Sequence, residues 1–315
     1  MTSRIRNNPK FLCFRSLIPL LLFCLSWNLC APSFAQSEEE KKYPDRIISS
    51  TPSITELLFA LGAGDQVVGV SDYCSYPPEA CTRPSVGGLL NPSVEFWITL
   101  KPDLIIFQGK NSHLTQNANN LNIKTLSVSV SGLQDIFNAI QILGKEIGRS
   151  NEAEALTAQL KEGLQSYQDK LSGIRPKNVL LLLGDSNDPS RDMYAVGKGT
   201  FLDELLTLSG GRNILPDSLS QYPKVSKEFI IKNSPEIIIE AGPKSRMNEQ
   251  ERLARIQSWK RFPTIQAVQT ESIHFIGADY ILIPGPRILS IIDNFSQAIH
   301  PELFPATPQS VHEKR

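Results

Sequence analysis

The stretch Val94–Phe107 reads VEFWITLKPDLIIF, and a second stretch, Ser226–Ile239, reads SKEFIIKNSPEIII. Both contain a glutamate followed by phenylalanine, then a proline followed by an acidic residue, and then a short apolar run. The matched positions are Glu95 with Glu228, Pro102 with Pro235, and Leu104–Ile106 with Ile237–Ile239. One element is therefore encoded twice, which predicts a chain built from two related halves.

A second repeated segment precedes the first one in the N-terminal half and also in the C-terminal half. ELLFALGAGDQVV (Glu56–Val68) matches ELLTLSGGRNIL (Glu204–Leu215) once one residue is skipped. Strands alternating with short helices predict an α/β fold in which each lobe is a parallel sheet wrapped by helices. We expect strands at 46–50, 66–71, 100–107, 123–129, 178–184, 193–197, 235–240 and 272–277.

Local signals place the helices between these strands. Ser53–Glu56 (SITE) and Thr200–Asp203 (TFLD) each predict a capping box, and Asn91 is expected to cap a helix whose first residue is Pro92. Further helices are expected at 114–122, 133–148 and 284–301. Glycines at 62 and 148 are suitable stop residues for the helices that precede them.

A longer helix is expected from about Asn151 to Leu171, with apolar residues spaced three and four apart. Its roughly 20 residues would span roughly 30 Å, enough to join two lobes. We therefore expect a signal peptide at 1–35, a linker at 36–44, an N-terminal lobe at 45–148, a bridging helix at 149–173, a C-terminal lobe at 174–306 and a tail at 307–315.

The N-terminus has the features of an export signal. Four basic residues precede the apolar run SLIPLLLFCLSWNL, and small residues at Ser33 and Ala35 predict cleavage before Gln36. A permanent transmembrane anchor is the alternative, but the run is shorter than the roughly 20 residues of a spanning helix. A lipid anchor on Cys30 is another alternative, although Trp27–Leu29 lacks the small residue expected before a lipidated cysteine.

The charge balance argues against nucleic acid as a partner. Residues 1–35 hold four of the 32 basic residues and none of the 32 acidic ones, so the remainder carries 28 basic against 32 acidic residues and a net charge of about −4. No block of basic residues interrupts this mildly acidic sequence. Nucleic acid or an anionic membrane is therefore not expected as the main partner.

Two cysteines remain after the signal segment, Cys74 and Cys81 in CSYPPEAC. In an exported protein, this spacing predicts a disulfide that closes a small loop. A zinc pair is less favoured because His113, His274, His300 and His312 are scattered. Two free thiols remain the other possibility.

No catalytic constellation emerges from the sequence. The GDS tripeptide at 184–186 lacks the spacing of a nucleophile elbow, and GKGT at 197–200 lacks the first glycine of a phosphate-binding loop. An exported α/β hydrolase would need a histidine or cysteine near Ser186. We expect a protein that is not an enzyme and that has no metal ligands or cofactor of its own.

A ligand is instead expected between the lobes, outside the carboxyl ends of the strands. The loops there carry aromatic and acidic side chains from both halves. They are Asp72, Tyr73, Tyr194, Tyr222, Asp279 and Tyr280. Several tyrosines converging from two lobes would suit a large, partly flat ligand with polar edges.

Glu95 and Glu228 occupy the same early position in a helix of each half. Acidic residues favour the first helical turn in general, by about 0.3–1 kcal/mol. That preference explains each glutamate alone, but it does not explain their matched distance from the following strand. Two equivalent exposed carboxylates would suit docking on a two-fold symmetric partner with basic pockets.

The chain resembles the periplasmic substrate-binding proteins of ABC importers whose two α/β lobes are bridged by one long helix, and most of all the vitamin B12-binding ones. The resemblance covers about Asp45 to Phe304. It is carried by RIISSTPSITELLFALGAGDQVVGVSDYCSYPPEA, VGGLLNPSVEFWITLKPDLIIF, VGKGTFLDELLTLSGGRNI, YPKVSKEFIIKNSPEIII and PGPRILSI. It implies a rigid pair of lobes in a periplasmic, monomeric receptor.

The resemblance also implies roles for individual residues. Glu95 and Glu228 would pair with arginines of the membrane permease dimer. The ligand pocket would include Tyr73, Tyr194, Tyr222 and Asp279, to which we add the adjacent Tyr280. Leu89 stands where corrin-binding members place a tryptophan, and Ile283 replaces a basic residue.

The ligand implied in this way is cobalamin or a related corrinoid, with a ferric siderophore or haem as the alternative. The bound molecule itself would carry the cobalt or iron. A receptor that signals, instead of feeding an importer, is a third possibility.

Overall fold

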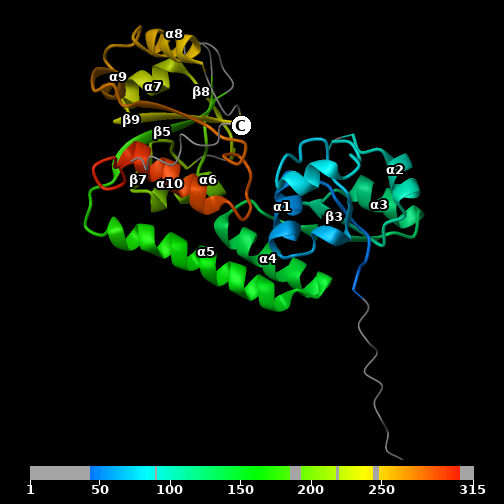
Figure 1. Ribbon diagram of the computed structural model, residues 1–315. Coiled ribbons are helices and arrows are strands. Elements are labelled where there is room, and N and C mark those ends of the chain that lie inside the picture. Colours follow the sequence, from blue (N-terminus) through cyan, green and yellow to red (C-terminus); the bar gives the residue numbers. More distant parts are fainter. Residues whose placement is uncertain (1–42, 89–90, 185–192, 218–219, 244–247, 306–315) are drawn as a thin grey trace, which may run out of the picture. The chain divides into compact units, whose positions relative to one another are not determined.

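Two four-stranded parallel sheets, one in each half of the chain, form the framework of the protein (Figure 1). The structure is a computed structural model, and it describes residues 43–88, 91–184, 193–217, 220–243 and 248–305. The expected α/β fold with two related lobes is confirmed.

The first lobe has the strand order β2-β1-β3-β4. The central strands are apolar along their length because helices cover both faces of a parallel sheet. Its elements are β1 (Ile47–Ser49), α1 (Pro52–Ala60), β2 (Val67–Gly69), α2 (Val94–Leu100), β3 (Leu104–Gln108), α3 (Ser112–Asn120), β4 (Lys124–Val128) and α4 (Leu133–Ile147).

The second lobe has the order β10-β9-β5-β7, beside a small antiparallel pair, β6-β8. Its elements are β5 (Lys177–Leu183), β6 (Met193–Tyr194), α6 (Phe201–Leu208), β7 (Gly211–Asn213), β8 (Lys224–Val225), α7 (Lys227–Asn233), β9 (Ile237–Gly242), α8 (Glu249–Trp259), α9 (Gln266–Gln269), β10 (Ile273–Gly277) and α10 (Ile288–Ile299).

The repeated sequence corresponds to repeated structure. The element α2 leads into β3 in the first lobe, and α7 leads into β9 in the second. Each helix ends on a left-handed residue directly before the matched proline, Lys101 (φ 46°) in one lobe and Ser234 (φ 39°) in the other. The duplication therefore extends to the backbone conformation of the turn.

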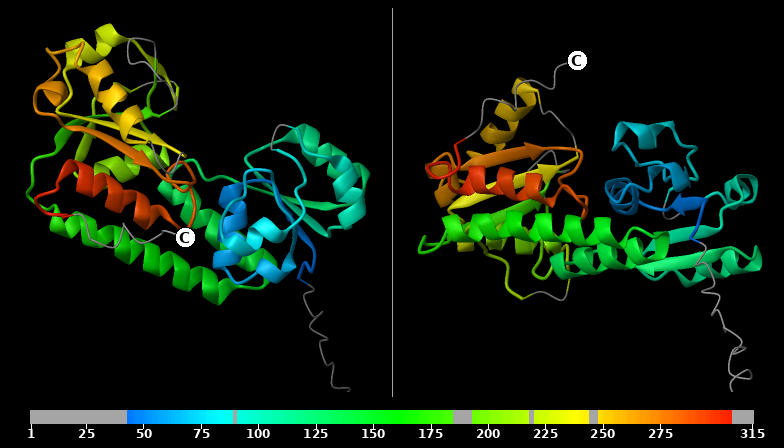
Figure 2. Two further views of the ribbon diagram at one scale, coloured as in Figure 1. Left: turned by 45° about the horizontal axis from the view of Figure 1, so that its top comes forward. Right: turned by 60° about the horizontal axis from the view of Figure 1, so that its bottom comes forward.

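The helix α5 (Ser150–Lys170) follows α4 and contacts α4, α10 and α6. Figure 2 shows it alongside α4 and also alongside α10. Leu160 and Leu164 are buried on one of its faces, as the three-and-four spacing predicted.

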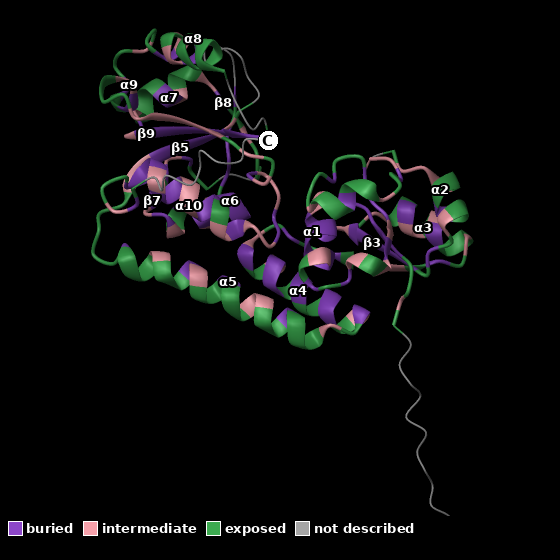
Figure 3. Ribbon diagram, in the orientation of Figure 1, coloured by how far each residue is buried: buried purple, intermediate pink, exposed green. Residues whose placement is uncertain are grey.

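The largest hydrophobic cluster includes residues of both lobes. Leu143 of α4, Leu160 of α5 and Phe295 of α10 belong to it, together with Ile47 of β1. Figure 3 shows buried and exposed residues alternating along α4 and α5. Two smaller clusters lie within single lobes, one in each. The lobes are consequently joined by shared core packing as well as by the chain.

The predicted helix caps are correct only in part. Thr200 caps α6, because its hydroxyl accepts a hydrogen bond from the Asp203 N–H at 3.2 Å, but the Asp203 carboxylate accepts from the Gly199 N–H at 3.1 Å, so the reciprocal bond of a capping box is not made to Thr200. The capping box at Ser53–Glu56 is wrong, since α1 begins at Pro52. The cap at Asn91 is also wrong, since α2 begins at Val94.

The predicted disulfide is absent, and Cys74 and Cys81 are both free. The Cys74 side chain is buried, with its sulfur 3.2 Å from the hydroxyls of Thr55 and Ser71. Cys81 is exposed and donates its S–H to the Ser75 carbonyl at 3.3 Å. The two thiols therefore have separate polar neighbours, and the structure gives the disulfide no support.

The predicted signal peptide, its cleavage site and the tail from 307 lie outside the described residues. In the part of the chain that is described, no helix is both long and apolar enough to cross a bilayer.

Close packing of α4 on α5 leads to a stability prediction. A Cβ at Gly144 would lie 2.4 Å from the Ala153 Cβ and 2.8 Å from the Arg149 carbonyl oxygen. The backbone cannot easily move away, so Gly144→Ala should lower the free energy of unfolding by about 1–3 kcal/mol. Urea unfolding followed by circular dichroism measures this change.

Gly163→Ala in α5 is the matched control. Its added methyl group would meet only the flexible side chain of Leu289, at 2.6 Å. Helix propensity favours alanine by about 1 kcal/mol, so this variant should stay close to wild type. Equal stability of the two variants would contradict the account of the α4–α5 packing.

Candidate functional site

A buried ion pair connects the two lobes. In Arg287, Nε donates to Oε2 of Glu56 at 2.9 Å, and Nη2 donates to the other oxygen of the same carboxylate. Nη1 of Arg287 donates to Oδ2 of Asp279 at 2.9 Å. Glu56 lies in α1 and is 2% exposed, whereas Arg287 is the N-cap residue of α10. The two parallel bonds to Glu56 give the strong, directional geometry of a bidentate pair.

Burial and pairing have opposite effects on the pKa of each group in this pair, and the balance differs between Glu56 and Arg287. Loss of water raises the pKa of Glu56 above its ordinary value, although Arg287 opposes the shift. Burial disfavours the charged guanidinium of Arg287, but hydrogen bonds to Glu56 and Asp279 outweigh it and raise its pKa. Both oxygens of Glu56 accept hydrogen bonds from Arg287, and the arrangement suits a structural connection between lobes.

Two tyrosine rings enclose the guanidinium. The Arg287 Cζ lies 4.0 Å from the ring centre of Tyr76 and 5.1 Å from that of Tyr280. Such cation–π contacts are worth about 0.5–2 kcal/mol. Tyr76 comes from the first lobe and Tyr280 from the second, and the Tyr280 hydroxyl accepts a hydrogen bond from the Asn294 side chain at 2.8 Å. The tyrosines therefore reinforce the connection that Glu56 and Arg287 make.

The repeat produces a second interlobe contact that is made by a glutamate, in this case to a backbone N–H. Glu204 of α6 aligns with Glu56 in the repeated sequence, and its Oε2 accepts a hydrogen bond from the Leu133 N–H at 2.9 Å. Leu133 is the first residue of α4. Beside it, the Phe201 N–H donates to the Ser131 carbonyl at 2.8 Å. Each lobe thus uses the glutamate of its repeated helix to hold the start of the other lobe's last helix.

A pocket of about 250 Å³ is lined by residues from both lobes. The first lobe contributes polar groups, and the second contributes an apolar wall formed by Leu282, Ile283 and Pro284. The first-lobe residues are Ser50, Thr51, Pro52, Ser53, Ser71, Tyr73 and Gln108. Most of these residues lie directly after β1, β2 or β3, where ligands of open α/β sheets bind.

The pocket contains hydrogen-bonding groups that the protein itself does not use. Among the described residues, the hydroxyls of Ser50 and Thr51 are buried and have no hydrogen-bond partner. Buried polar groups are normally paired, so such groups beside a pocket indicate a place where a polar ligand group can compensate them.

The residues proposed for the pocket from sequence separate into groups. Tyr73 lines the pocket and is 73% exposed. Tyr194 and Tyr222 are exposed too, and Tyr194 lies under Lys224 at 5.3 Å in the β6–β8 pair, but neither tyrosine lines the pocket. Partial burial raises the pKa of Tyr222. Asp279 and Tyr280 are engaged with Arg287.

Leu89 lies outside the described residues. The residues that sequence reasoning missed are Glu56, Tyr76 and Arg287. One signal was available, since Glu56 and Glu204 are matched in the repeat.

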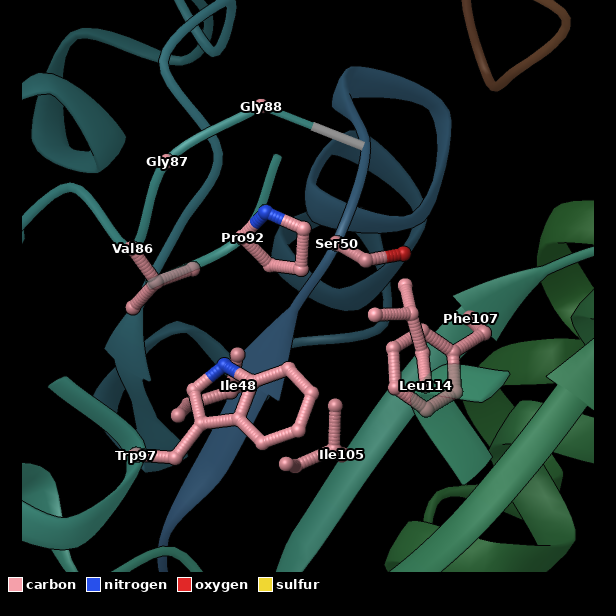
Figure 4. A pocket seen from close by; sticks show the side chains of 10 residues that line it. All are labelled: Ile48, Ser50, Val86, Gly87, Gly88, Pro92, Trp97, Ile105, Phe107 and Leu114. Atoms are coloured by element: carbon pink, nitrogen blue, oxygen red, sulfur yellow. The ribbon is translucent and has the colours of Figure 1, made fainter. Parts of the chain in front are cut away.

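A second cavity lies wholly within the first lobe, and Figure 4 shows its ten lining residues. Its volume of about 10 Å³ is at the lower limit for a single water molecule, so it cannot hold a large ligand. Trp97 of α2 lines it and is 1% exposed. This buried indole fixes α2 to the sheet, which leaves Glu95 on the exposed side of the helix.

The described residues that line the pocket include hydroxyl-bearing side chains but no histidine, cysteine, aspartate or glutamate. Of the histidines that the structure describes, His113, His274 and His300, none lines it. Within the described residues, no group of three or more His, Cys, Asp or Glu side chains is placed to hold a metal ion.

Comparison with known proteins agrees with this geometry. The periplasmic binding protein family matches residues 47–280. An ABC transporter substrate-binding lipoprotein of Bacillus subtilis, YvrC, is 29% identical over 84% of the chain and 82% of its own length. A vitamin B12-binding protein of Salmonella paratyphi A is 32% identical over 73% of the chain and 79% of its own length.

Solved structures with the same fold bind different ligands. The vitamin B12-binding protein BtuF of Vibrio cholerae has a TM-score of 0.69 at 27% identity and covers 81% of this chain and 96% of its own. A haem-binding protein of Pseudomonas aeruginosa has a TM-score of 0.72 at 22% identity, with coverage of 84% and 95%. The latter likeness concerns the fold alone.

The lobe connection is testable through Glu56. Glu56→Gln removes the buried carboxylate from the Arg287 guanidinium and leaves it only the half-exposed Asp279 as a counter-charge, and loss of one partner of a buried pair costs about 3–5 kcal/mol. The midpoint of urea unfolding should fall accordingly. Asp279→Asn is the matched control, because its side chain is 45% exposed and its loss should cost less than about 1 kcal/mol. If Asp279→Asn lowered the free energy of unfolding more than Glu56→Gln does, then Asp279, and not Glu56, would be the main partner of Arg287.

Proposed function

The chain belongs to the periplasmic binding protein family, and we propose that it captures cobalamin or a related corrinoid in the pocket between its lobes. It then delivers this ligand to an ABC import permease. The observation that carries the proposal is the pocket lined from both lobes, in which the exposed Tyr73 ring stands beside hydroxyls that lack protein partners.

The chemistry of the pocket fits a flat macrocycle with polar edges. The Tyr73 ring offers an aromatic face, and Leu282, Ile283 and Pro284 offer apolar surface from the other lobe. Ser50 and Thr51 offer hydroxyls at the same pocket, which suit the amide groups around a corrin ring. The cobalt arrives with the ligand, so the protein needs no metal site.

The relatives support a corrinoid more than they support haem. Vitamin B12-binding proteins are among the relatives near 30% identity, whereas the haem-binding neighbour shares the fold at 22%. None of the described residues that line the pocket is basic, so the carboxylates of haem would find no counter-charge there. Haem or a ferric siderophore is the second candidate because the same scaffold carries such ligands elsewhere.

Docking on the permease is assigned to Glu95 of α2 and Glu228 of α7. Both residues are exposed, and they occupy matched positions of the repeat. Exposed carboxylates at related sites suit basic residues on a two-fold symmetric partner. Export through a signal peptide cleaved after Ala35 completes the proposal, with a lipid anchor at Cys30 as its alternative.

Calorimetric titration of the purified mature chain with cyanocobalamin tests the ligand. We expect binding at micromolar concentration or tighter. Tyr73→Ala should weaken it about tenfold because a stacking face is lost, while Tyr73→Phe keeps the ring and should bind as wild type does. Absence of heat with cyanocobalamin, together with binding of haemin or a ferric siderophore, would replace the corrinoid by the second candidate.

Uptake of radiolabelled cyanocobalamin by cells tests the docking role. Glu95→Ala combined with Glu228→Ala should abolish uptake, because the permease loses both acidic partners, and should leave ligand affinity unchanged. A loss of ligand affinity in the purified double variant would show that these residues belong to the pocket.

A further inference from the structure

Each docking glutamate is followed, one helical turn later, by an exposed isoleucine. Ile98 of α2 is 57% exposed and Ile231 of α7 is 37% exposed. Residues three apart lie on the same face of a helix, so each isoleucine is beside its glutamate. We call Glu95 and Ile98 the first ridge, and Glu228 and Ile231 the second ridge.

The exposure of these apolar side chains follows from how the helices are anchored. Trp97 of α2 and Ile230 of α7 are each 1% exposed and hold their helices against the sheets. Glu95 and Glu228, two residues before the anchors, lie on the opposite face of each helix, and Ile98 and Ile231 lie about 100° round the helix from the anchors, on a side that stays exposed. Large apolar side chains beside a charge on an otherwise polar surface are typical of a contact surface for another protein.

The two ridges differ in their electrostatics. Lys227 directly precedes Glu228 and lies 3.9 Å from its carboxylate, whereas Val94 precedes Glu95. Hydrogen bonds from the Glu228 backbone N–H and the Ser226 hydroxyl hold the pKa of Glu228 below its ordinary value, and Lys227 adds to this effect. In the described part of the chain, no cation lies within ion-pair distance of Glu95.

The ridges also differ in apolar surface. Ile98 is 57% exposed whereas Ile231 is 37% exposed, and Phe96, on a different flank of α2, is 44% exposed while its counterpart Phe229 is only partly exposed. A basic residue that approaches Glu228 must compete with partners that the carboxylate already has. At Glu95 it meets a carboxylate that has no ion-pair partner among the described residues and lies next to the exposed Ile98.

We propose that the permease contact is uneven, with the first ridge contributing most of the affinity and Ile98 acting as an apolar contact beside the Glu95 ion pair. The proposal rests on the proposed function, since it takes the partner to be the permease of an ABC importer. The chemistry expected of this partner is a basic residue flanked by an apolar hollow at each of two symmetry-related positions. Interface energy is commonly concentrated in a few such buried side chains.

Binding to the ABC permease and ATPase of the same genome, reconstituted in lipid nanodiscs, tests the proposal by biolayer interferometry. Glu95→Gln should weaken binding about tenfold and Glu228→Gln about twofold at low salt. Ile98→Ser should weaken binding about tenfold at any salt concentration, because its contribution is apolar. Ile142→Ser is the control, since Ile142 is an exposed isoleucine on α4, outside both ridges.

A reciprocal exchange tests the cause of the difference. Lys227→Val should make Glu228→Gln as damaging as Glu95→Gln, and Val94→Lys should reduce the effect of Glu95→Gln. Equal effects of Glu95→Gln and Glu228→Gln, or Ile98→Ser binding as Ile142→Ser does, would overturn the uneven contact while the proposed function stands. If the wild-type protein binds no permease, the proposed function fails and the uneven contact fails with it.

Discussion

The bidentate pair between Glu56 and Arg287 is the interaction on which the interlobe geometry depends. Glu56 is almost completely buried in α1 of the first lobe, and Arg287 caps α10 of the second. A buried charge without its partner is unfavourable by several kcal/mol, so each group fixes the position of the other. The pocket is lined by residues close in sequence to both, Thr51–Ser53 on one side and Leu282–Pro284 on the other. Its shape is therefore set by the same contact.

Duplication explains why the connection is made twice. Glu204 occupies the position in the repeat that corresponds to Glu56. Glu204 binds the first residue of α4, whereas Glu56 binds the N-cap residue of α10. Together with the hydrophobic cluster that continues from one lobe into the other, these contacts resist relative movement of the lobes. If the proposed ligand binds in this pocket, a connection of this kind would lower the ordering cost of binding.

Much of the architecture could be predicted from the sequence, because strands and helices leave local patterns. The apolar run at Leu104–Ile106 and the three-and-four spacing in α5 both give the correct elements. The interlobe pair could not be predicted, since Glu56 and Arg287 are separated by 231 positions and neither lies in a distinctive motif. Glu56 even satisfied the pattern of a capping box, although its side chain turns to the other lobe.

The residues of the candidate site also divide into those that a local sequence pattern indicates and those that depend on tertiary contacts. Tyr73 was predicted from the signal of an aromatic side chain in a loop after a strand, and it lines the pocket, whereas Glu95 and Glu228 were predicted from the repeat and are exposed in the structure. Tyr194 and Tyr222 satisfied the same loop criterion, but they lie outside the pocket lining. The orientation of a loop side chain depends on tertiary contacts, such as that between Tyr194 and Lys224, and a sequence pattern does not contain them.

A crystal structure of the mature protein grown with cyanocobalamin tests the central claim most directly. We expect a corrin ring between the lobes against Tyr73, hydrogen bonds from Ser50 or Thr51 to its amides, and an intact pair between Glu56 and Arg287. A corrinoid bound away from this pocket, or bound there with the Glu56–Arg287 pair broken, would contradict it.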